Sequence, residues 1–250
     1  MASSKQIILI TGGNSGIGFS LAELLLADES KHVIITSRDV ERGTRALRDL
    51  QAMKLPGTVE MLPLEVADPD SILELSRKVD EAHGRLDALV NNAAQAVAAP
   101  GMSLFEHMQR CFAVNVSGPA VMIETFLPLL RKSSSTPRII NVGSGQGSIG
   151  RTLSPDGPSG PLTIPYKTSK AALNMLSSVE VVKLRQAHEK IKVFTYCPGF
   201  CVSNLGPFNK PENGAKPTVD GARPMVAILN GEEDHEDGGY LNSEGGRHPW

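Results

Sequence analysis

The stretch Gln6-Ile-Ile-Leu-Ile-Thr-Gly-Gly-Asn-Ser-Gly-Ile-Gly18 decides the fold. It begins with a short apolar run typical of a buried strand, and the apolar residues that follow its glycine-rich turn share one face of a helix: Ile17, Leu21, Leu24 and Leu25. Glycines in such a turn let the backbone approach a pyrophosphate, which the positive end of the helix attracts. The stretch therefore predicts the first β-α unit of a dinucleotide-binding sheet, with an ordinary glycine-rich turn as the alternative.

The same alternation continues along the chain. Further strand-like runs, rich in Val, Ile and Leu, occupy residues 31–37, 58–62, 86–91, 138–142 and 192–196. Helical patterns fill the intervals, at residues 39–53, 69–83, 103–131 and 165–189. Repeated β-α-β units predict an α/β fold of the doubly wound Rossmann type, a parallel sheet with helices on both faces. No repeat or charged linker marks a boundary, so residues 1–250 are expected to form a single domain.

Two segments rich in Gly, Pro and Ser, residues 145–165 and 199–217, are expected to be loops. Each follows a predicted strand, so both should emerge at the carboxyl edge of the sheet, where folds of this type bind ligands. The first is expected to shape one wall of the pocket through its prolines, Pro155, Pro158, Pro161 and Pro165.

Composition excludes several other classes of protein. The formal charge of −2 gives no reason to expect nucleic acid or an anionic membrane as partner. The six His show no metal-ligand spacing, so no metal is predicted. The three Cys form no CxxC pair, and a disulfide framework is not expected: Cys111, Cys197 and Cys201. No apolar run reaches the length of a signal peptide core or a membrane span, and a cytoplasmic location is expected.

The end of the second strand-like run bears on the choice of dinucleotide. An acidic residue there would hydrogen-bond the free ribose hydroxyl of NAD, but this chain has Ser37 and Arg38, with Asp39 just beyond. A guanidinium suits the 2′-phosphate of NADP, and a serine hydroxyl does not repel it. The alternative is a surface arginine paired with Asp39 or Glu41. We favour NADP.

Tyr166 is followed four residues later by Lys170, which places both side chains on one face of a helix. A phenol normally titrates near pH 10, and a fixed cation beside it favours the phenolate and brings its pKa closer to neutral pH. Alone, the pair is more typical of an exposed helix. Ser144 upstream and the glycine-rich turn make a catalytic pair the better interpretation.

Together these residues resemble the short-chain dehydrogenase/reductase family in its compact form, almost from end to end. Residues 11–18 look like the family's TGxxxGxG turn, and residues 91–94 are similar to its NNAG segment. Asn115 lies in a matching Asn-Val-Ser-Gly context, Tyr166 and Lys170 match YxxxK, and Pro198-Gly199 matches the turn after the sixth strand. Within the family, residues 36–43 look like the NADPH-dependent carbonyl reductases.

The resemblance implies hydride transfer between a nicotinamide and a carbonyl carbon. Tyr166 would protonate the alkoxide, Ser144 would hydrogen-bond the same oxygen, and Lys170 would lower the pKa of the tyrosine and bind the nicotinamide ribose. Asn115 would hold a water that links Lys170 to solvent, with bridging of a helix kink as the alternative. The implied cofactor contacts are Gly12, Asn14, Ser15, Gly16, Ile17, Gly18, Ser37, Arg38, Glu65, Val66, Asn91, Ala93, Tyr166, Lys170, Pro198, Gly199 and Ser203.

The chain departs from the family pattern at a few positions. Ala94 replaces the last glycine of NNAG, and Gly143 stands where a second serine is common. Glu65 occupies the place of an aspartate that meets the adenine, and Ser203 that of a threonine. None of these changes removes a group that the chemistry needs.

The leading hypothesis is an NADPH-dependent reductase of a ketone or aldehyde in a small or medium, rather apolar molecule. Phe200, Leu205 and Phe208 are expected either to cap that substrate or to pack within their loop. An NAD(P)-linked oxidation of an alcohol and a non-redox or sensor protein that binds NADPH are the alternatives. Helices 103–131 and 165–189 are those through which the family forms dimers and tetramers, so a homo-oligomer is possible.

Overall fold

A computed structural model of the chain describes residues 5–155, 157 and 164–250. Its centre is a seven-stranded sheet in the order β3-β2-β1-β4-β5-β6-β7, with every neighbouring pair parallel. The strands are β1 (Gln6–Ile10), β2 (Lys31–Ser37), β3 (Thr58–Pro63), β4 (Ala88–Asn91), β5 (Arg138–Val142), β6 (Lys192–Cys197) and β7 (Tyr240–Asn242). The predicted doubly wound α/β fold is confirmed.

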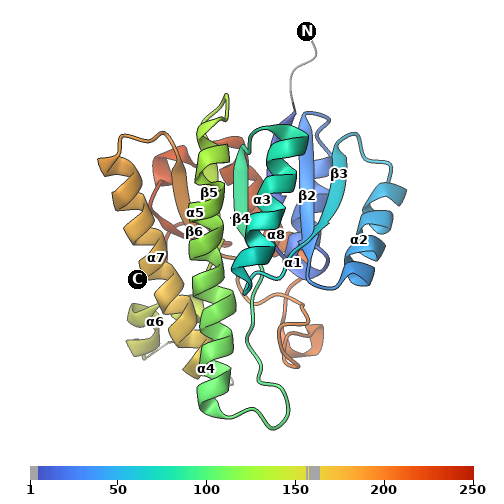
Figure 1. Cartoon of the computed structure of the whole chain (residues 1–250). Helices are drawn as coiled ribbons and strands as arrows, with labels where there is room; N and C mark the ends of the chain where they lie inside the picture. Colours follow the sequence, from blue (N-terminus) through green and yellow to red (C-terminus); the bar gives the residue numbers. More distant parts are fainter. Residues whose placement is uncertain (1–4, 156, 158–163) are drawn as a thin grey trace.

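Helices cover both faces of the sheet (Figure 1). One face is covered by α3 (Pro69–His83), α5 (Gly118–Arg131) and α7 (Ile164–Gln186), and the other by α1 (Gly16–Leu26), α2 (Val40–Ala52) and α8 (Thr218–Asn230). Alternate residues of β1 serve the two layers: Ile7 and Leu9 enter the core cluster of the first face, Ile8 and Ile10 that of the second. The period of two along a strand thus divides one apolar run between two cores.

Helix ends follow the capping residues of the sequence. Asp39 caps α2 by accepting a hydrogen bond from the backbone N–H of Arg42, and Asp68 caps α3 through Asp70. Ser103 and Glu106 form a capping box at the start of α4 (Leu104–Phe112). These local signals explain why most predicted helix bounds agree with the structure within one or two residues.

The predicted helix 103–131 is one helical run with an irregular middle. It consists of α4, a π-helical turn at Ala113–Ser117 and α5. By length and composition this 28-residue run could cross a membrane, since its most apolar 18-residue window has a mean hydropathy of 1.4. However, 56% of its most apolar window is buried inside the fold, and buried core helices share this composition.

Several elements differ from the sequence prediction. Helix α8 and strand β7 were not predicted, because α8 contains Gly221 and Pro224 and β7 has only three residues. Loop 145–165 carries a 3-10 turn at Gly145–Gly147 and the short helix α6 (Ile149–Leu153), and loop 199–217 a 3-10 turn at Pro211–Asn213. Of the prolines expected to shape the first loop, Pro158 and Pro161 lie outside the described residues.

The phenyl ring of Phe126 is fully buried at the centre of the core between the sheet and α5. We expect Phe126→Ala to lower the free energy of unfolding by about 3–5 kcal/mol, because it leaves a cavity that the packed helices cannot fill. Leu73→Ala is the control, since that side chain on α3 is 64% exposed, and it should change stability by less than about 0.5 kcal/mol. Urea unfolding followed by circular dichroism measures both variants. A single domain should unfold in one transition, so two separate transitions would contradict the single-domain prediction.

Candidate active site

A cavity of about 1140 Å³ lies at the carboxyl edge of the sheet. Its wall combines the turn after β1, the ends of β2 and β5, the segment after β4, the start of α7 and the loop after β6. Both predicted loops contribute to it, as their positions after strands predict. The cavity is large enough for a dinucleotide together with a small substrate.

The glycine-rich turn fits a pyrophosphate. Gly12 and Gly16 have φ values of 64° and 58°, in the left-handed region that glycine adopts without strain. A Cβ on Gly18 would lie 2.5 Å from Nδ2 of Asn92, so this glycine permits close packing behind the turn. Ser15 is the N-cap residue of α1 and its side chain makes no capping hydrogen bond, so the first N–H groups of the helix are available to an anion.

Two arginines lie at the end of β2. The Arg38 side chain is 65% exposed, and its Nη1 lies 3.7 Å from Oε2 of Glu65 rather than beside Asp39 or Glu41. Asp39 is occupied elsewhere, because its carboxylate caps α2 and pairs with Nε of Arg42 at 3.4 Å. Arg42, which sequence reasoning missed, also lines the cavity. This end of the cavity therefore presents two guanidinium groups.

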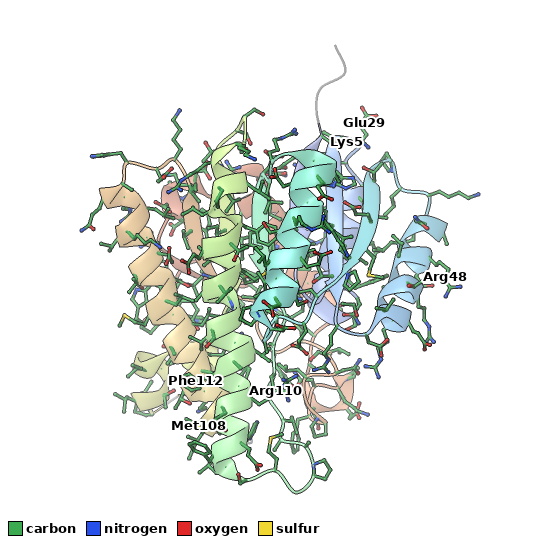
Figure 2. The ribbon with its side chains drawn as sticks, viewed as in Figure 1. Lys5, Glu29, Arg48, Met108, Arg110 and Phe112 are labelled. Carbon is green, nitrogen blue, oxygen red and sulfur yellow. The ribbon has the colours of Figure 1, made fainter. Side chains whose placement is uncertain are left out.

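Glu65 and Val66 line the cavity beside these arginines. The carboxylate of Glu65 accepts a hydrogen bond from the backbone N–H of Ala67 and lies 3.5 Å from Nη2 of Arg110. Arg110 is carried by α4 (Figure 2). With Arg38 on its other side, Glu65 is balanced by two cations. Its predicted adenine contact stays a prediction.

The NNAG-like segment after β4 is divided between the sheet and the cavity. Asn91 is buried and donates a hydrogen bond to Oδ1 of Asn141, so its side chain does not line the cavity. Asn92 and Ala93 do line it, and both backbone N–H groups donate to Oγ1 of Thr11. All of the predicted cofactor contacts line the cavity except Gly18 and Asn91.

Ser144, Tyr166 and Lys170 meet where β5 ends and α7 begins. Ser144 lies close enough to Tyr166 for its hydroxyl to lower the pKa of the phenol. Nζ of Lys170 lies 5.8 Å from the centre of the Tyr166 ring and donates a 2.7 Å hydrogen bond to the carbonyl of Val142, the last residue of β5. All three side chains lie on the cavity wall. The structure thus brings three of the four predicted catalytic residues together.

Burial dominates the titration of this pair. It raises the pKa of Tyr166 to about 12, against the lowering effect of the Ser144 hydroxyl. It lowers the pKa of Lys170 to about 8. Both shifts favour the neutral form of a buried group, as desolvation requires. At neutral pH Tyr166 is a phenol with a proton to give, and most Lys170 side chains keep their charge.

Asn115 lies inside the π-helical turn and is fully buried. Its Nδ2 donates to the carbonyl of Gln95 and to Oγ of Ser169, and its Oδ1 accepts from the N–H of Gln95. The side chain therefore holds the segment after β4 against α7. Both protons of Nδ2 are thereby used, and the predicted contact with a water stays a prediction. π-helical turns of this kind are frequent at functional sites.

The loop after β6 forms the opposite wall. Pro198, Gly199 and Ser203 line the cavity, as predicted for a cofactor site, and so do Phe200, Leu205 and Phe208. Both phenyl rings are exposed, Phe200 by 45% and Phe208 by 51%, so simple packing within the loop does not account for them.

The thiol of Cys197 is buried beside this wall, where Sγ accepts a 3.0 Å hydrogen bond from the N–H of Gly145. Burial raises its pKa, and it raises that of Cys201 to about 11. Both cysteines are free and unreactive thiols in this setting, as expected from the sequence.

A second cluster of titratable groups lies away from the cavity, on β2, β3 and the last turn of α3. Oε1 of Glu60 lies 3.1 Å from Nε2 of His32 and 2.6 Å from Nε2 of His83. These three residues offer ligand atoms within 4.8 Å of one another, a juxtaposition that their sequence spacing does not reveal. Their mutual hydrogen bonds account for the geometry, and the prediction of no metal site stays a prediction.

Comparison with known proteins agrees with this geometry. The family model described as short chain dehydrogenase matches residues 6–213. A short-chain dehydrogenase of Penicillium roqueforti is 36% identical over 90% of this chain and 88% of its own. A short-chain dehydrogenase/reductase of Talaromyces stipitatus is 32% identical over 99% of both chains. The crystal structure of NADPH-bound carbonyl reductase from chicken fatty liver superimposes with a TM-score of 0.83 at 29% identity, over 99% of this chain and 100% of the other.

The site and these matches define an oxidoreductase that works with a nicotinamide cofactor. The chain belongs to the short-chain dehydrogenase/reductase family and resembles its carbonyl reductases.

The chain contains only three tyrosines, and burial raises the pKa of every one: Tyr166, Tyr196 and Tyr240. We expect the folded protein to show no tyrosinate absorbance with a midpoint near pH 10, the usual value for an exposed phenol. Unfolding in urea should restore a midpoint near pH 10. By linkage, the three phenols stabilise the fold below about pH 10 and lose that contribution as the pH rises through their folded pKa values. A folded-state midpoint near 10 in an absorbance titration at the tyrosinate band would contradict the burial of these rings.

Proposed function

We propose that the protein reduces a ketone or aldehyde to an alcohol with NADPH, and that Tyr166 is the general acid. The observation that carries this proposal is the presence of Ser144, Tyr166 and Lys170 together on the wall of a cavity that also contains the glycine-rich turn. When bound, NADPH supplies the hydride that the carbonyl carbon receives.

The residues at the end of β2 support the choice of NADPH. Arg38 makes only a loose ion pair, 3.7 Å from Glu65, and its side chain is 65% exposed. Ion pairs at the surface contribute little free energy. A phosphate that forms shorter, charge-assisted hydrogen bonds with the guanidinium can therefore replace Glu65 as its partner. Arg42 adds a second positive charge, and Ser37 lines the wall without a carboxylate. Asp39 is already engaged by Arg42, which argues against its use as an acceptor for a ribose hydroxyl.

Each side chain of the site has its own role in the transfer of a proton to the carbonyl oxygen. Tyr166 transfers its phenolic proton to the carbonyl oxygen as the negative charge develops there. Ser144 donates a hydrogen bond to the same oxygen and fixes its position. Lys170, largely protonated with a pKa of about 8, stabilises the tyrosinate that remains. Asn115, in the π-helical turn packed against α7, would hold the water that returns the proton.

The cofactor proposal predicts the effect of Arg38→Ala. Loss of the guanidinium should raise the KM for NADPH at least tenfold, as expected for one charge-assisted contact, and leave the KM for NADH within about twofold. Arg48→Ala is the control, because Arg48 lies on the outer face of α2 and points into solvent (Figure 2). Initial rates with the two cofactors measure both. Equal losses with NADPH and NADH would refute the role given to Arg38.

The acid role predicts the effect of Tyr166→Phe. The phenyl ring keeps the packing but removes the proton, so kcat should fall by about 10²–10⁴-fold while the Kd for NADPH stays within about threefold. Nicotinamide absorbance with a panel of ketones, aldehydes and quinones measures turnover, and fluorescence titration measures binding. Tyr196→Phe is a control for the loss of a buried phenol, since its hydroxyl bonds the carbonyl of Gly221. Turnover that survives Tyr166→Phe would remove the acid role, and binding of NADPH without any turnover would favour a sensor.

Two further expectations accompany this function. The cytoplasmic location expected from the sequence stays a prediction. Association into a homo-oligomer is supported by exposed apolar side chains on the helices that the family uses for it: Leu104, Phe105, Met175, Val179 and Val182.

A further inference from the structure

One part of the cavity wall is polar and is not used by the chemistry proposed above. It consists of Arg151 on α6 and His248 in the segment 246–250, and both side chains line the same cavity as Ser144 and Tyr166. Sequence analysis gave neither residue a role, because the two are 97 positions apart.

Arg151 lies close against the backbone that follows Ser144. A Cβ on Gly145 would be 2.0 Å from Nη1 of Arg151, so only glycine at position 145 leaves room for the guanidinium. Among the residues that the structure describes, no carboxylate lies within ion-pair distance of Arg151. Its described side-chain contact is a 3.3 Å hydrogen bond from Nη1 to Nε2 of His248.

His248 accepts this bond as a neutral ring. A guanidinium can only donate, so Nε2 carries the lone pair and Nδ1 the proton. Burial and the charge of Arg151 lower the pKa of His248, and Glu244 opposes them. Glu244 also lines the cavity but is exposed. Within the described residues, the partner of the positively charged Arg151 is therefore the neutral ring of His248 and not a carboxylate.

The segment that carries His248 is tied to the catalytic loop. Oγ of Ser148 donates a 2.5 Å hydrogen bond to the carbonyl of Pro249, and the N–H of Gly150 donates a 2.9 Å bond to that of Trp250. The Trp250 ring stacks on Tyr240 at 5.2 Å, and the hydroxyl of Tyr240 donates to the carbonyl of Ser144. Arg151 and His248 are thus held in a fixed position relative to the serine that binds the reacting oxygen.

Arg151 is too far from Arg38 to serve the same phosphate. Arg38 follows β2 and Ser144 follows β5, and β1 and β4 lie between those strands. Three strand spacings separate the two ends of the cavity by about 14 Å. The arginine near the catalytic serine therefore faces the substrate end of the cavity.

From this geometry we propose that Arg151, supported by His248, binds an anionic oxygen of the carbonyl substrate. The inference rests on the proposed reductase function and refines it, since the preferred substrate carries an acidic group in addition to its ketone or aldehyde. A carboxylate or an acidic enol or phenol offers the same chemistry to a guanidinium, a charge-assisted and bidentate hydrogen bond. Phe200 and Phe208, which line the same cavity, would contact the apolar body of the same molecule.

A pair of aldehydes that differ in one charge tests the proposal. With NADPH, the wild-type protein should reduce 4-carboxybenzaldehyde with a KM at least tenfold below that for methyl 4-formylbenzoate. Arg151→Met keeps the aliphatic stem and should lower kcat/KM for the acid by about tenfold to a hundredfold, mainly through KM, and leave the ester within about twofold. Arg151→Lys should recover part of the preference. A second pair, 4-hydroxybenzaldehyde and 4-methoxybenzaldehyde, tests whether a phenolate binds as a carboxylate does. If it does, the KM for the hydroxy compound relative to that for the methoxy compound should fall as the pH rises through the pKa of the phenol.

Arg247→Met is the matched control, because Arg247 lies next to His248 but is exposed and pairs with Glu236. It should change neither substrate's kinetics. Thermal unfolding of each variant shows whether the segment 246–250 remains in place.

Binding can be tested without turnover. Calorimetry with NADP present measures the affinity of wild-type and Arg151→Met protein for 4-carboxybenzaldehyde and for its methyl ester. Equal affinity of the two proteins for the acid would overturn the anion site even if both reduce aldehydes. Tighter binding of the acid by the wild type, without any reduction, would retain the site and count against the reductase function.

Discussion

The hydrogen bond from Nζ of Lys170 to the carbonyl of Val142 is the interaction on which the site depends. It joins the first turns of α7 to the end of β5, in an environment where Lys170 is only 2% exposed. An ammonium buried this far must have a partner, and the strand carbonyl supplies it without a counter-charge. The approach is possible because Gly147 has no side chain, since a Cβ there would be 2.6 Å from the backbone of Lys170. Tyr166, one helical turn earlier, is placed beside Ser144 as a consequence.

The sequence predicted those parts of the molecule whose cause is local. The strand runs, the helix bounds and the glycine-rich turn each depend on a few neighbouring residues, and each appears where it was expected. The caps Asp39 and Asp68 show the local cause of two of these helix starts. The i, i+4 spacing also placed Tyr166 and Lys170 on one face. What the spacing could not show is the direction of the pKa of Tyr166. A cation nearby suggests a lowered value, but burial of both groups outweighs it and leaves a protonated phenol.

The remaining parts depend on contacts between distant residues. Strand β7 is recognisable only by its pairing with β6, and His248 reaches the cavity only because Pro249 and Trp250 bond to α6. Asn91 illustrates the opposite case, a motif residue whose side chain serves the sheet through Asn141 while its neighbour Asn92 lines the wall. A motif gives the order of residues along the chain, but the register of a strand decides which side chain faces the ligand.

The distribution of charge along the cavity bears on both proposals. Arg38 and Arg42 lie at one end, Arg151 lies near Ser144 at the other, and the buried Lys170 lies beside Tyr166. Glu65 and Asp39 balance the first end through ion pairs, whereas the described neighbour of Arg151 is a neutral imidazole. The favourable electrostatic interaction of a bound anion should therefore be larger at Arg151 than at Arg38 and Arg42. No carboxylate of the described residues already forms an ion pair with Arg151. The sequence suggested a rather apolar substrate from Phe200, Leu205 and Phe208. With Arg151 in the same cavity as these rings, the wall fits a molecule that is apolar along its body and acidic at one end.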